Sequence, residues 1–214
     1  MSIVVGASLV VLAVTPLFSA CDSQPSSATG ADTGPDLILV KPQTKGSLTE
    51  RDLEAVAELP SVSRVAPQVA TTTQLTSEDR NWSTRVIGTT PSYLELRGWR
   101  VAEGTFIAES DVDSVVLGDT VARELANGAP MIGRAVRIRG VPFLVVGVLA
   151  PSGQNEDVAI VPLRAFRWRS NASLDQFFAL SKPGTSARAQ AEIGAQLREH
   201  HHLRDDFRVI VVPR

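Results

Sequence analysis

Cysteine is nearly absent from this chain of 214 residues, in which Cys21 stands alone. A disulfide within the chain is therefore excluded, because a bridge needs two cysteines. Aromatic residues are scarce, at 5%, and the formal net charge is only −2. This near balance of charge gives no electrostatic reason to expect nucleic acid as a partner. Hydrophobic residues make up 43% of the chain, which is enough for the core of one ordinary domain or two small ones.

Motifs that carry chemistry are missing as well. No G-x-x-x-x-G-K-[ST] phosphate-binding loop occurs, so the usual ATP site is not expected. All three histidines fall in one cluster, and the spacing assembles no set of nucleophile, base and acid. We therefore expect a protein that is not an enzyme and that uses no cofactor.

The histidine cluster itself, "REHHHLRDD" (198–206), has two interpretations. Histidine beside acidic residues is a combination that binds Zn²⁺ or Ni²⁺. Consecutive side chains on a helix fan out by about 100° each, however, so His200, His201 and His202 cannot all share one metal ion. The alternative is a solvated last helical turn, in which histidine and arginine favour the negative end of the helix. The geometry favours the second interpretation, and no metal site is predicted.

Charge is absent from the first twenty residues, which form a nearly unbroken apolar run from Ile3 to Ala20. Such a run is close to the roughly 20 residues that cross a bilayer as a helix, and it also resembles the hydrophobic part of an export signal. The residues from Leu17 to Cys21 look like a bacterial lipobox, which makes Cys21 the predicted lipid attachment site. A retained transmembrane helix remains the main alternative, since a signal peptide usually begins with Lys or Arg, and a cleaved soluble form is the other. Residues 1–21 are predicted to be this signal or anchor, and residues 22–35, rich in Ser, Gly, Thr and Asp, a flexible linker.

Beyond the linker, the two ends of the chain repeat one order of elements. Strand-like runs at 36–41 and 62–75 flank a segment with helical spacing, residues 47–60. Ser47 and Glu50 have the spacing of a capping box at the start of that helix. Near the C-terminus, residues 174–182, 186–202 and 206–213 are predicted as strand, helix and strand. We expect these two βαβ halves to form one split α+β sheet with helices on one face.

The middle of the chain has shorter elements. It offers a strand at 81–88, a short helix at 91–98 that begins with Pro91, and a strand, turn and helix within 113–128. Residues 135–153 alternate as a β-hairpin with its turn at Gly140. The predicted division is a split α+β part, residues 36–76 and 160–214, and an inserted β-rich part, residues 77–159.

Three stretches carry a resemblance to a known family. They are "VIGTTPSYLELRGWRVAEGTFIAESDV", "VVLGDTVARELANGAPMIGRAVRIRGVPFLVVGVLAPSG" and "DVAIVPL". Together with "SLTERDLEAVAELPSVSRVAPQV" and "DDFRVIVV", they resemble the MacB-like periplasmic core domain of ABC transporter permeases of the MacB, FtsX and LolC type. The resemblance covers residues 36–214. It implies a split "porter" part with an inserted "sabre" part, the same division that the spacing predicts.

The resemblance also implies a function and partners. We expect an extracytoplasmic interaction module of an export or mechanotransmission system, held at the cell membrane on its periplasmic side. Its expected partners are proteins of an ABC system, namely an ATPase and permease or a periplasmic adaptor, and no nucleic acid. The alternative is a truncated or orphan permease fragment without transport activity of its own.

One short stretch is the predicted contact surface. In "LRAFRWRSN" (163–171), arginines alternate with aromatic residues, a combination enriched at protein interfaces. The alternative is that Phe166 packs inward while the other side chains cover the surface. The predicted partner contacts are Arg164, Arg167, Trp168 and Arg169.

Overall fold

The computed structural model describes residues 34–168 and 173–212, and for Arg167 and Trp168 it describes the backbone alone. The predicted anchor, residues 1–21, and nearly all of the predicted linker lie outside the described residues. Within the described part, strands predominate over helices. The elements in chain order are β1 Leu37–Pro42, α1 Glu50–Ala57, β2 Val62–Ser77, β3 Arg80–Thr89, α2 Ser92–Leu96, β4 Val101–Gly104, β5 Ser114–Leu117, α3 Asp119–Ala126, β6 Ala135–Ile138, β7 Val141–Leu149, β8 Val158–Pro162, the 3₁₀ helix η1 Leu163–Trp168, β9 Gln176–Ser181, α4 Ser186–His200 and β10 Phe207–Val212.

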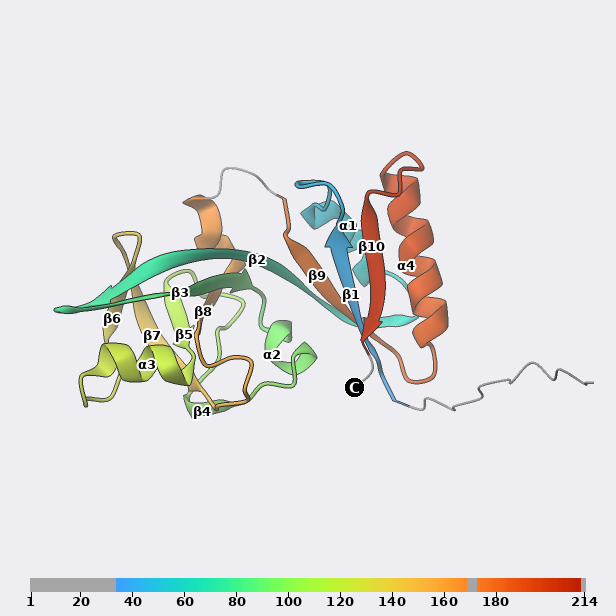
Figure 1. The fold of residues 1–214 in the computed structure, drawn as a ribbon. Coiled ribbons are helices and arrows are strands. Elements are labelled where there is room, and N and C mark those ends of the chain that lie inside the picture. The colour runs from blue at the N-terminus through green and yellow to red at the C-terminus, as the bar shows by residue number, and fades with distance from the viewer. Residues whose placement is uncertain (1–33, 169–172, 213–214) are drawn as a thin grey trace, which may run out of the picture. The chain divides into compact units, whose positions relative to one another are not determined.

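The strands form one continuous sheet in the order β10-β1-β9-β2-β3-β8-β5-β7-β4, with β6 paired to β2 and β7 (Figure 1). We call β10, β1, β9 and the first part of β2 the terminal group. The remaining strands, with the second part of β2, are the inserted group. The fold is therefore a mixed α+β fold dominated by its sheet, as the sequence predicts.

Strand β2 belongs to both groups. From Val62 to Gln68 it pairs with β9, and from Val69 to Ser77 it pairs with β3. The change of partner therefore lies before residue 77, where the inserted part is predicted to begin. At the other end, β8 pairs with β3 and β5, so Ile160, Val161 and Pro162 lie in the inserted group although they are predicted in the split α+β part. The single long strand β2 passes from the terminal group to the inserted group. Because residues 62–77 are β-type throughout, the sequence gives no local signal of where the pairing partner changes.

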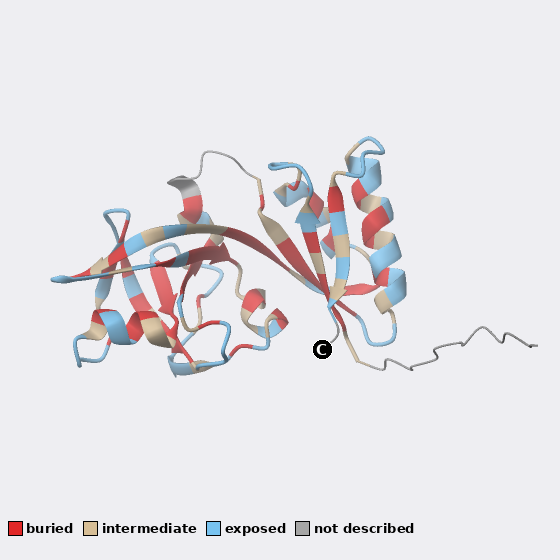
Figure 2. Ribbon diagram, viewed as in Figure 1, coloured by how far each residue is buried: buried red, intermediate tan, exposed pale blue. Residues whose placement is uncertain are grey.

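The two faces of the terminal group are buried against different helices. Ile38, Val40 and Phe177 point to the face that α1 and α4 cover. Leu37, Phe178 and Leu180 point to the opposite face, where they pack with residues of the inserted group that include Tyr93 of α2. This split follows from the alternation of side chains along a strand. Figure 2 shows the buried residues concentrated along the strands and on the inner side of α4.

Helix α1 begins later than the sequence predicts, and with a different cap. The backbone N–H and the hydroxyl of Thr49 both donate to the Asp52 carboxylate, each at 2.8 Å. The predicted pair of Ser47 and Glu50 is therefore wrong. Ser47 instead donates to the backbone carbonyl of Asp206 at 3.1 Å, a contact across 159 positions. Two overlapping S/T-x-x-D/E patterns stand in this stretch, and the tertiary contact of Ser47 decides between them.

Helix α4 ends at His200, two residues before the predicted end. His202 and Leu203 have positive φ values of 53° and 64°. L-residues rarely adopt this left-handed conformation, and it does not continue a right-handed helix. The chain therefore turns here and returns to the sheet as β10.

The predicted short elements of the inserted group are present. Pro91 precedes the first residue of α2, and the hairpin of β6 and β7 turns through Arg139 and Gly140, both at positive φ. Tyr93 and Leu96 of α2 are buried, at 2% and 0% exposure, so this helix packs rather than presents a surface. None of the helices in residues 34–168 and 173–212 has the length and apolar character needed to cross a membrane.

Candidate functional site

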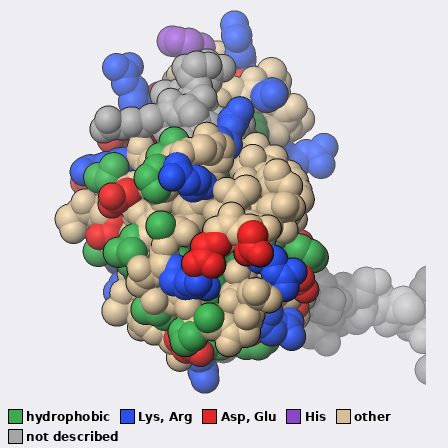
Figure 3. Space-filling model, turned by 90° about the vertical axis from the view of Figure 1, so that its left-hand side faces the viewer, with side chains coloured by type: hydrophobic (Ala, Val, Ile, Leu, Met, Phe, Trp, Pro, Cys, Tyr) green, Lys and Arg blue, Asp and Glu red, His purple; other side chains and the backbone are tan. Residues whose placement is uncertain are grey.

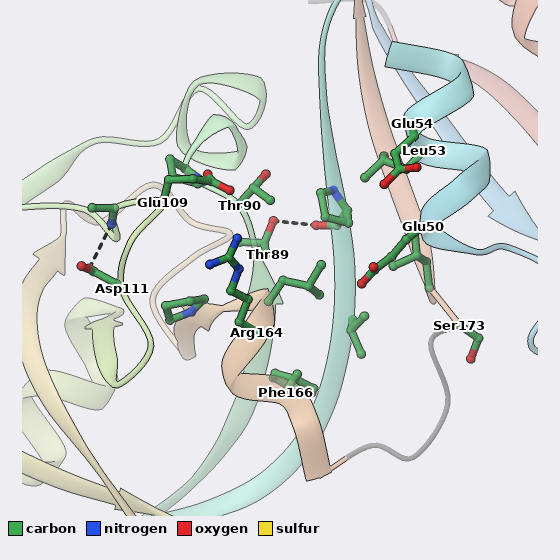
Figure 4. Close-up of a pocket in the computed structure, with 17 residues that line it drawn as sticks. Glu50, Leu53, Glu54, Thr89, Thr90, Glu109, Asp111, Arg164, Phe166 and Ser173 are labelled. Carbon is green, nitrogen blue, oxygen red and sulfur yellow. Dashed lines mark hydrogen bonds between the residues drawn. The ribbon is translucent and has the colours of Figure 1, made fainter. Parts of the chain in front are cut away.

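A groove opens where β2 changes partners. Its cavity of about 680 Å³ is bordered by α1, the adjoining parts of β2, the end of β3, the loop before β5, and η1 (Figure 4). The groove lies at Gln68 and Val69, where β2 passes from pairing with β9 to pairing with β3. It therefore lies between the terminal group and the inserted group, on elements far apart in the sequence.

The junction beneath the groove is held by buried polar contacts. The Thr89 hydroxyl donates to the Pro67 carbonyl at 2.5 Å, which ties the end of β3 to β2. The Tyr93 hydroxyl donates to Oε1 of Gln68 at 2.8 Å, and the Gln176 side chain donates to the same oxygen at 3.1 Å. Buried hydrogen bonds of this kind are costly to leave unmade, so they fix the relative position of the strands that they join.

The floor of the groove is apolar. Phe166 of η1 is 4% exposed and lies over Gly88, where a β-carbon would come within 3 Å of its ring. Leu53 of α1 and Leu163 of η1 are partly buried and border the same cavity. The apolar lining consists of Leu53, Pro67, Val69, Pro91, Ala108, Pro162, Leu163, Phe166 and Leu174.

The rim of the groove is acidic. Glu50 and Glu54 stand on the α1 side, and Glu109 and Asp111 stand on the opposite side, with Arg164 between them (Figure 4). Asp111 accepts hydrogen bonds from the backbone N–H of Ala108 and from the hydroxyl of Ser114. Within residues 34–168 and 173–212, no ion pair neutralises the other three carboxylates. The groove therefore presents an apolar floor and an excess of negative charge.

A second cluster holds the start of α1 in place. The side chain of His201, 8% exposed, lies between two carboxylates: Nε2 is 3.3 Å from Asp52, and Nδ1 is 2.5 Å from Asp206. Nδ1 of His200 is 3.2 Å from the other oxygen of Asp52. The cluster joins the first turn of α1 to the end of α4 and the start of β10. Because Asp52 stands between Glu50 and Leu53 in the sequence, the cluster positions one wall of the groove.

The charge states in this cluster follow from the contacts. Burial alone would lower the pKa of His201, but the hydrogen bonds to Asp206 and Asp52 and their negative charges outweigh burial and raise it. Burial likewise would raise the pKa of Asp52, and the hydrogen bonds from Thr49, His201 and His200 outweigh it and lower the pKa. These contacts favour the protonated form of the His201 imidazole between the two carboxylates.

The predicted solvated turn is therefore wrong for His201, whose ring is enclosed. His202 is exposed, as the prediction requires. In the part of the chain that the structure describes, no three or more His, Cys, Asp or Glu side chains are grouped so that they could hold a metal ion.

The predicted contact residues lie in different places. Arg164 is exposed and borders the groove. Arg167 and Trp168 complete η1, and Arg169 and Cys21 lie outside the described residues. Phe166 packs inward, as one of the two alternatives expects.

The acidic rim was not among the features predicted from the sequence. One signal was available: Glu50, Glu54 and Glu58 follow one another at four-residue spacing, which places like charges on one face of a helix. Nothing in the sequence brings Glu109 and Asp111 to the opposite side, because that proximity comes from the sheet.

Comparison with known proteins gives a consistent picture. Residues 1–196 match the family model described as "MacB-like periplasmic core domain". The macrolide export ATP-binding/permease protein MacB of Syntrophobacter fumaroxidans is 35% identical over 179 residues, which covers 78% of this chain and 25% of that protein. The corresponding protein of Rhodopirellula baltica is 34% identical over 195 residues, 81% of this chain and 28% of that protein. The chain thus spans about a quarter of the length of the curated relatives it matches.

Solved structures share the fold. The periplasmic region of MacB from Actinobacillus actinomycetemcomitans superposes with a TM-score of 0.73 at 17% identity, covering 87% of this chain and 92% of that one. The extracellular domain of the ABC-type transporter YknZ from Gram-positive bacteria gives a TM-score of 0.71 at 15% identity, covering 82% and 99%. At these identities the likeness concerns the fold alone.

Proposed function

Because the chain belongs to the family of MacB-like periplasmic core domains, we propose that it is an extracytoplasmic interaction module of an ABC-type export or mechanotransmission system. The observation that carries the proposal is the family match over most of the chain, together with the shared fold. In this proposal the chain is held at the cell membrane, faces the periplasm, and binds an adaptor or another protein of the system. Its parts are a porter-like split α+β part and a sabre-like inserted part.

The surface of the inserted group supports a role in binding. Seven large hydrophobic side chains are exposed in the described part of the chain, and four of them lie in this group: Val112, Ile132, Val141 and Leu144. A contiguous apolar patch rimmed by polar residues is typical of a protein interface, and we propose that these four side chains contribute to one. Figure 3, which views this end of the molecule, shows hydrophobic side chains among acidic and basic ones of mixed sign.

Site-specific photocrosslinking tests the proposal. A benzoylphenylalanine would replace Leu144, which is 49% exposed in the inserted group, in the full chain and in the cell that makes it. We expect a crosslink to an ATPase, permease or adaptor subunit of an ABC system, identified by mass spectrometry. The matched control is Leu203, 83% exposed between α4 and β10, which should give no such crosslink. If neither Leu144 nor any other exposed position of the inserted group reaches an ABC component, the proposal is wrong.

A separate measurement tests the proposed lipid attachment. The intact mass of the membrane-extracted protein is compared between the wild type and Cys21→Ala. A chain that begins at residue 21 and carries added acyl mass, lost in the variant, supports lipidation. A full-length unmodified mass would show instead that the apolar start is retained.

A further inference from the structure

We infer that the groove between α1 and η1 binds a basic segment of a partner protein, in which Lys or Arg residues flank an apolar side chain. This inference rests on the proposed function, namely that the chain binds an envelope protein, and it names the chemistry of the partner at one site.

Charge is the first argument. Among the residues that the structure describes, four carboxylates and one guanidinium line the groove, an excess of three negative charges. The whole chain has 23 acidic and 21 basic residues, an excess of only two. The described lining of the groove therefore carries more net negative charge than the whole chain, whereas the face in Figure 3 mixes both signs. A concave site lined by one sign of charge attracts ligands of the opposite sign.

No ion pair in the described part of the chain joins Glu50, Glu54 or Glu109 to a basic side chain. Glu50 and Glu54 occupy positions i and i+4 of α1, where like charges repel each other and destabilise a helix. The last turn of α1 contains no basic residue, and no ion pair joins either glutamate to Arg51 within residues 34–168 and 173–212. A cation bound between the two sides of the groove would relieve this repulsion.

The apolar floor of the groove offers a place for an apolar side chain of the partner. Leu53 and Leu163 are only partly buried, and they face a cavity whose volume is in the range of ordinary ligand pockets, roughly 300–1,000 Å³. An apolar side chain of the partner would pack between Leu53, Leu163 and Phe166, while its basic neighbours reach the carboxylates at the rim. Apolar anchors surrounded by polar contacts are the usual arrangement of a small protein interface.

The position of the groove makes its walls rigid enough for this role. The hydrogen bond from Thr89 to Pro67 fixes the junction of β3 and β2, and the contacts of Asp52 with His201 fix the start of α1. Glu50 and Glu54 are thus presented from a supported helix, and the hydrogen bonds that Asp111 accepts from Ala108 and Ser114 hold the loop that carries the other two carboxylates.

Selection from a random peptide library tests the inference without assuming the partner. The full chain in detergent is immobilised and exposed to a phage-displayed library of 12-residue peptides. The variant Glu50→Gln/Glu54→Gln removes two rim charges, and Glu58→Gln is the matched control, since it removes an exposed charge of the same helix outside the groove. We expect enriched peptides that carry Lys or Arg beside Leu, Phe or Trp.

A synthetic copy of an enriched peptide then gives affinities. It should bind the wild type and Glu58→Gln equally, and the double variant about 2- to 30-fold more weakly, the range expected for two exposed charge pairs. Affinity for the wild type should fall as salt rises. Absence of enrichment, enrichment of acidic or neutral peptides, or equal affinity for all three proteins overturns the inference. A crosslink from Leu144 to an ABC component in the same case would leave the proposed function intact, so the two failures are distinguishable.

Discussion

The imidazole of His201 shows how one residue couples distant parts of this chain. Its two nitrogens contact the carboxylates of Asp52 in α1 and Asp206 before β10. Its ring packs edge-on against that of Phe207, with 5.7 Å between the ring centroids. A group whose pKa is raised on folding stabilises the folded state fully below its unfolded pKa, about 6.5 for histidine. That contribution is lost as pH rises through the folded pKa. For Asp52, whose pKa is lowered, the stabilisation is present above about 3.9 and is lost as pH falls through the folded pKa.

Replacement of His201 should therefore destabilise the protein in a pH-dependent manner. We expect His201→Gln to lower the free energy of unfolding by about 1–3 kcal/mol at pH 5.5, because two carboxylates lose a charged hydrogen-bond donor. At pH 9 the loss should be smaller, since the wild-type imidazole is then less often protonated. Urea unfolding at both pH values measures this, with the exposed His202→Gln as the control. Equal losses for His201→Gln at the two pH values would contradict the charge state assigned to the ring.

At the scale of elements, two glycines differ in whether their surroundings leave room for a side chain. Gly194 lies inside α4, where a β-carbon would meet only the Arg198 guanidinium, at 3.3 Å. Gly147 lies in β7, where a β-carbon would stand 2.1 Å from the backbone oxygen of Thr105. Gly194 lowers the stability of its helix although there is space for a methyl group. Gly147 is required because two backbone segments approach each other closely there.

Alanine at these two positions should change stability in opposite directions. We expect Gly194→Ala to stabilise the protein by about 0.5–1 kcal/mol, the difference in helix propensity, because the end of an arginine side chain can move aside. Gly147→Ala should destabilise it by roughly 1–3 kcal/mol, as overpacking against a backbone does. Urea midpoints measure both changes. A destabilising effect of Gly194→Ala would show that the inner side of α4 has no room for a methyl group.

At the scale of the whole molecule, the terminal and inserted groups share their cores. One cluster of buried side chains joins Ile38 and Phe177 with Val115 and Val136, and the other joins Leu37 and Phe178 with Tyr93 and Ile160. Strand β2 runs through both groups without a break. Neither group can lose its structure without exposing apolar surface of the other.

The two groups should therefore unfold in one transition. In a Trp168→Phe chain, the remaining tryptophans, Trp82 and Trp99, both belong to the inserted group, so fluorescence reports this group while far-UV circular dichroism also reports α1 and α4. We expect the two signals to give the same urea midpoint and slope, as two-state unfolding requires. Separate midpoints would show that the groups are independent folding units.

Local patterns predicted most of the elements, and their errors have identifiable causes. The hairpin at Gly140 and the short helix after Pro91 depend on neighbouring residues, and both are confirmed. The cap of α1 was wrong because Ser47 binds a carbonyl of a distant segment. The end of α4 was predicted too late because the left-handed conformation that ends it is adopted by His202 and Leu203. Neither is a glycine, the residue that usually marks such a position in a sequence. Contact roles for Arg167, Trp168 and Arg169 and the lipid role of Cys21 stay predictions.

The sequence by itself determined the order of the elements and the family. These properties depend on periodicity and on residue types within a short stretch, which folding preserves. Only the tertiary structure decided where β2 changes partners, which carboxylates face Arg164, and which histidine is enclosed. Asp52 and His201 are 149 positions apart in the sequence and 3.3 Å apart in the fold. No local pattern encodes that proximity, because it arises when the closing strand β10 pairs with β1 and brings the end of α4 against the start of α1.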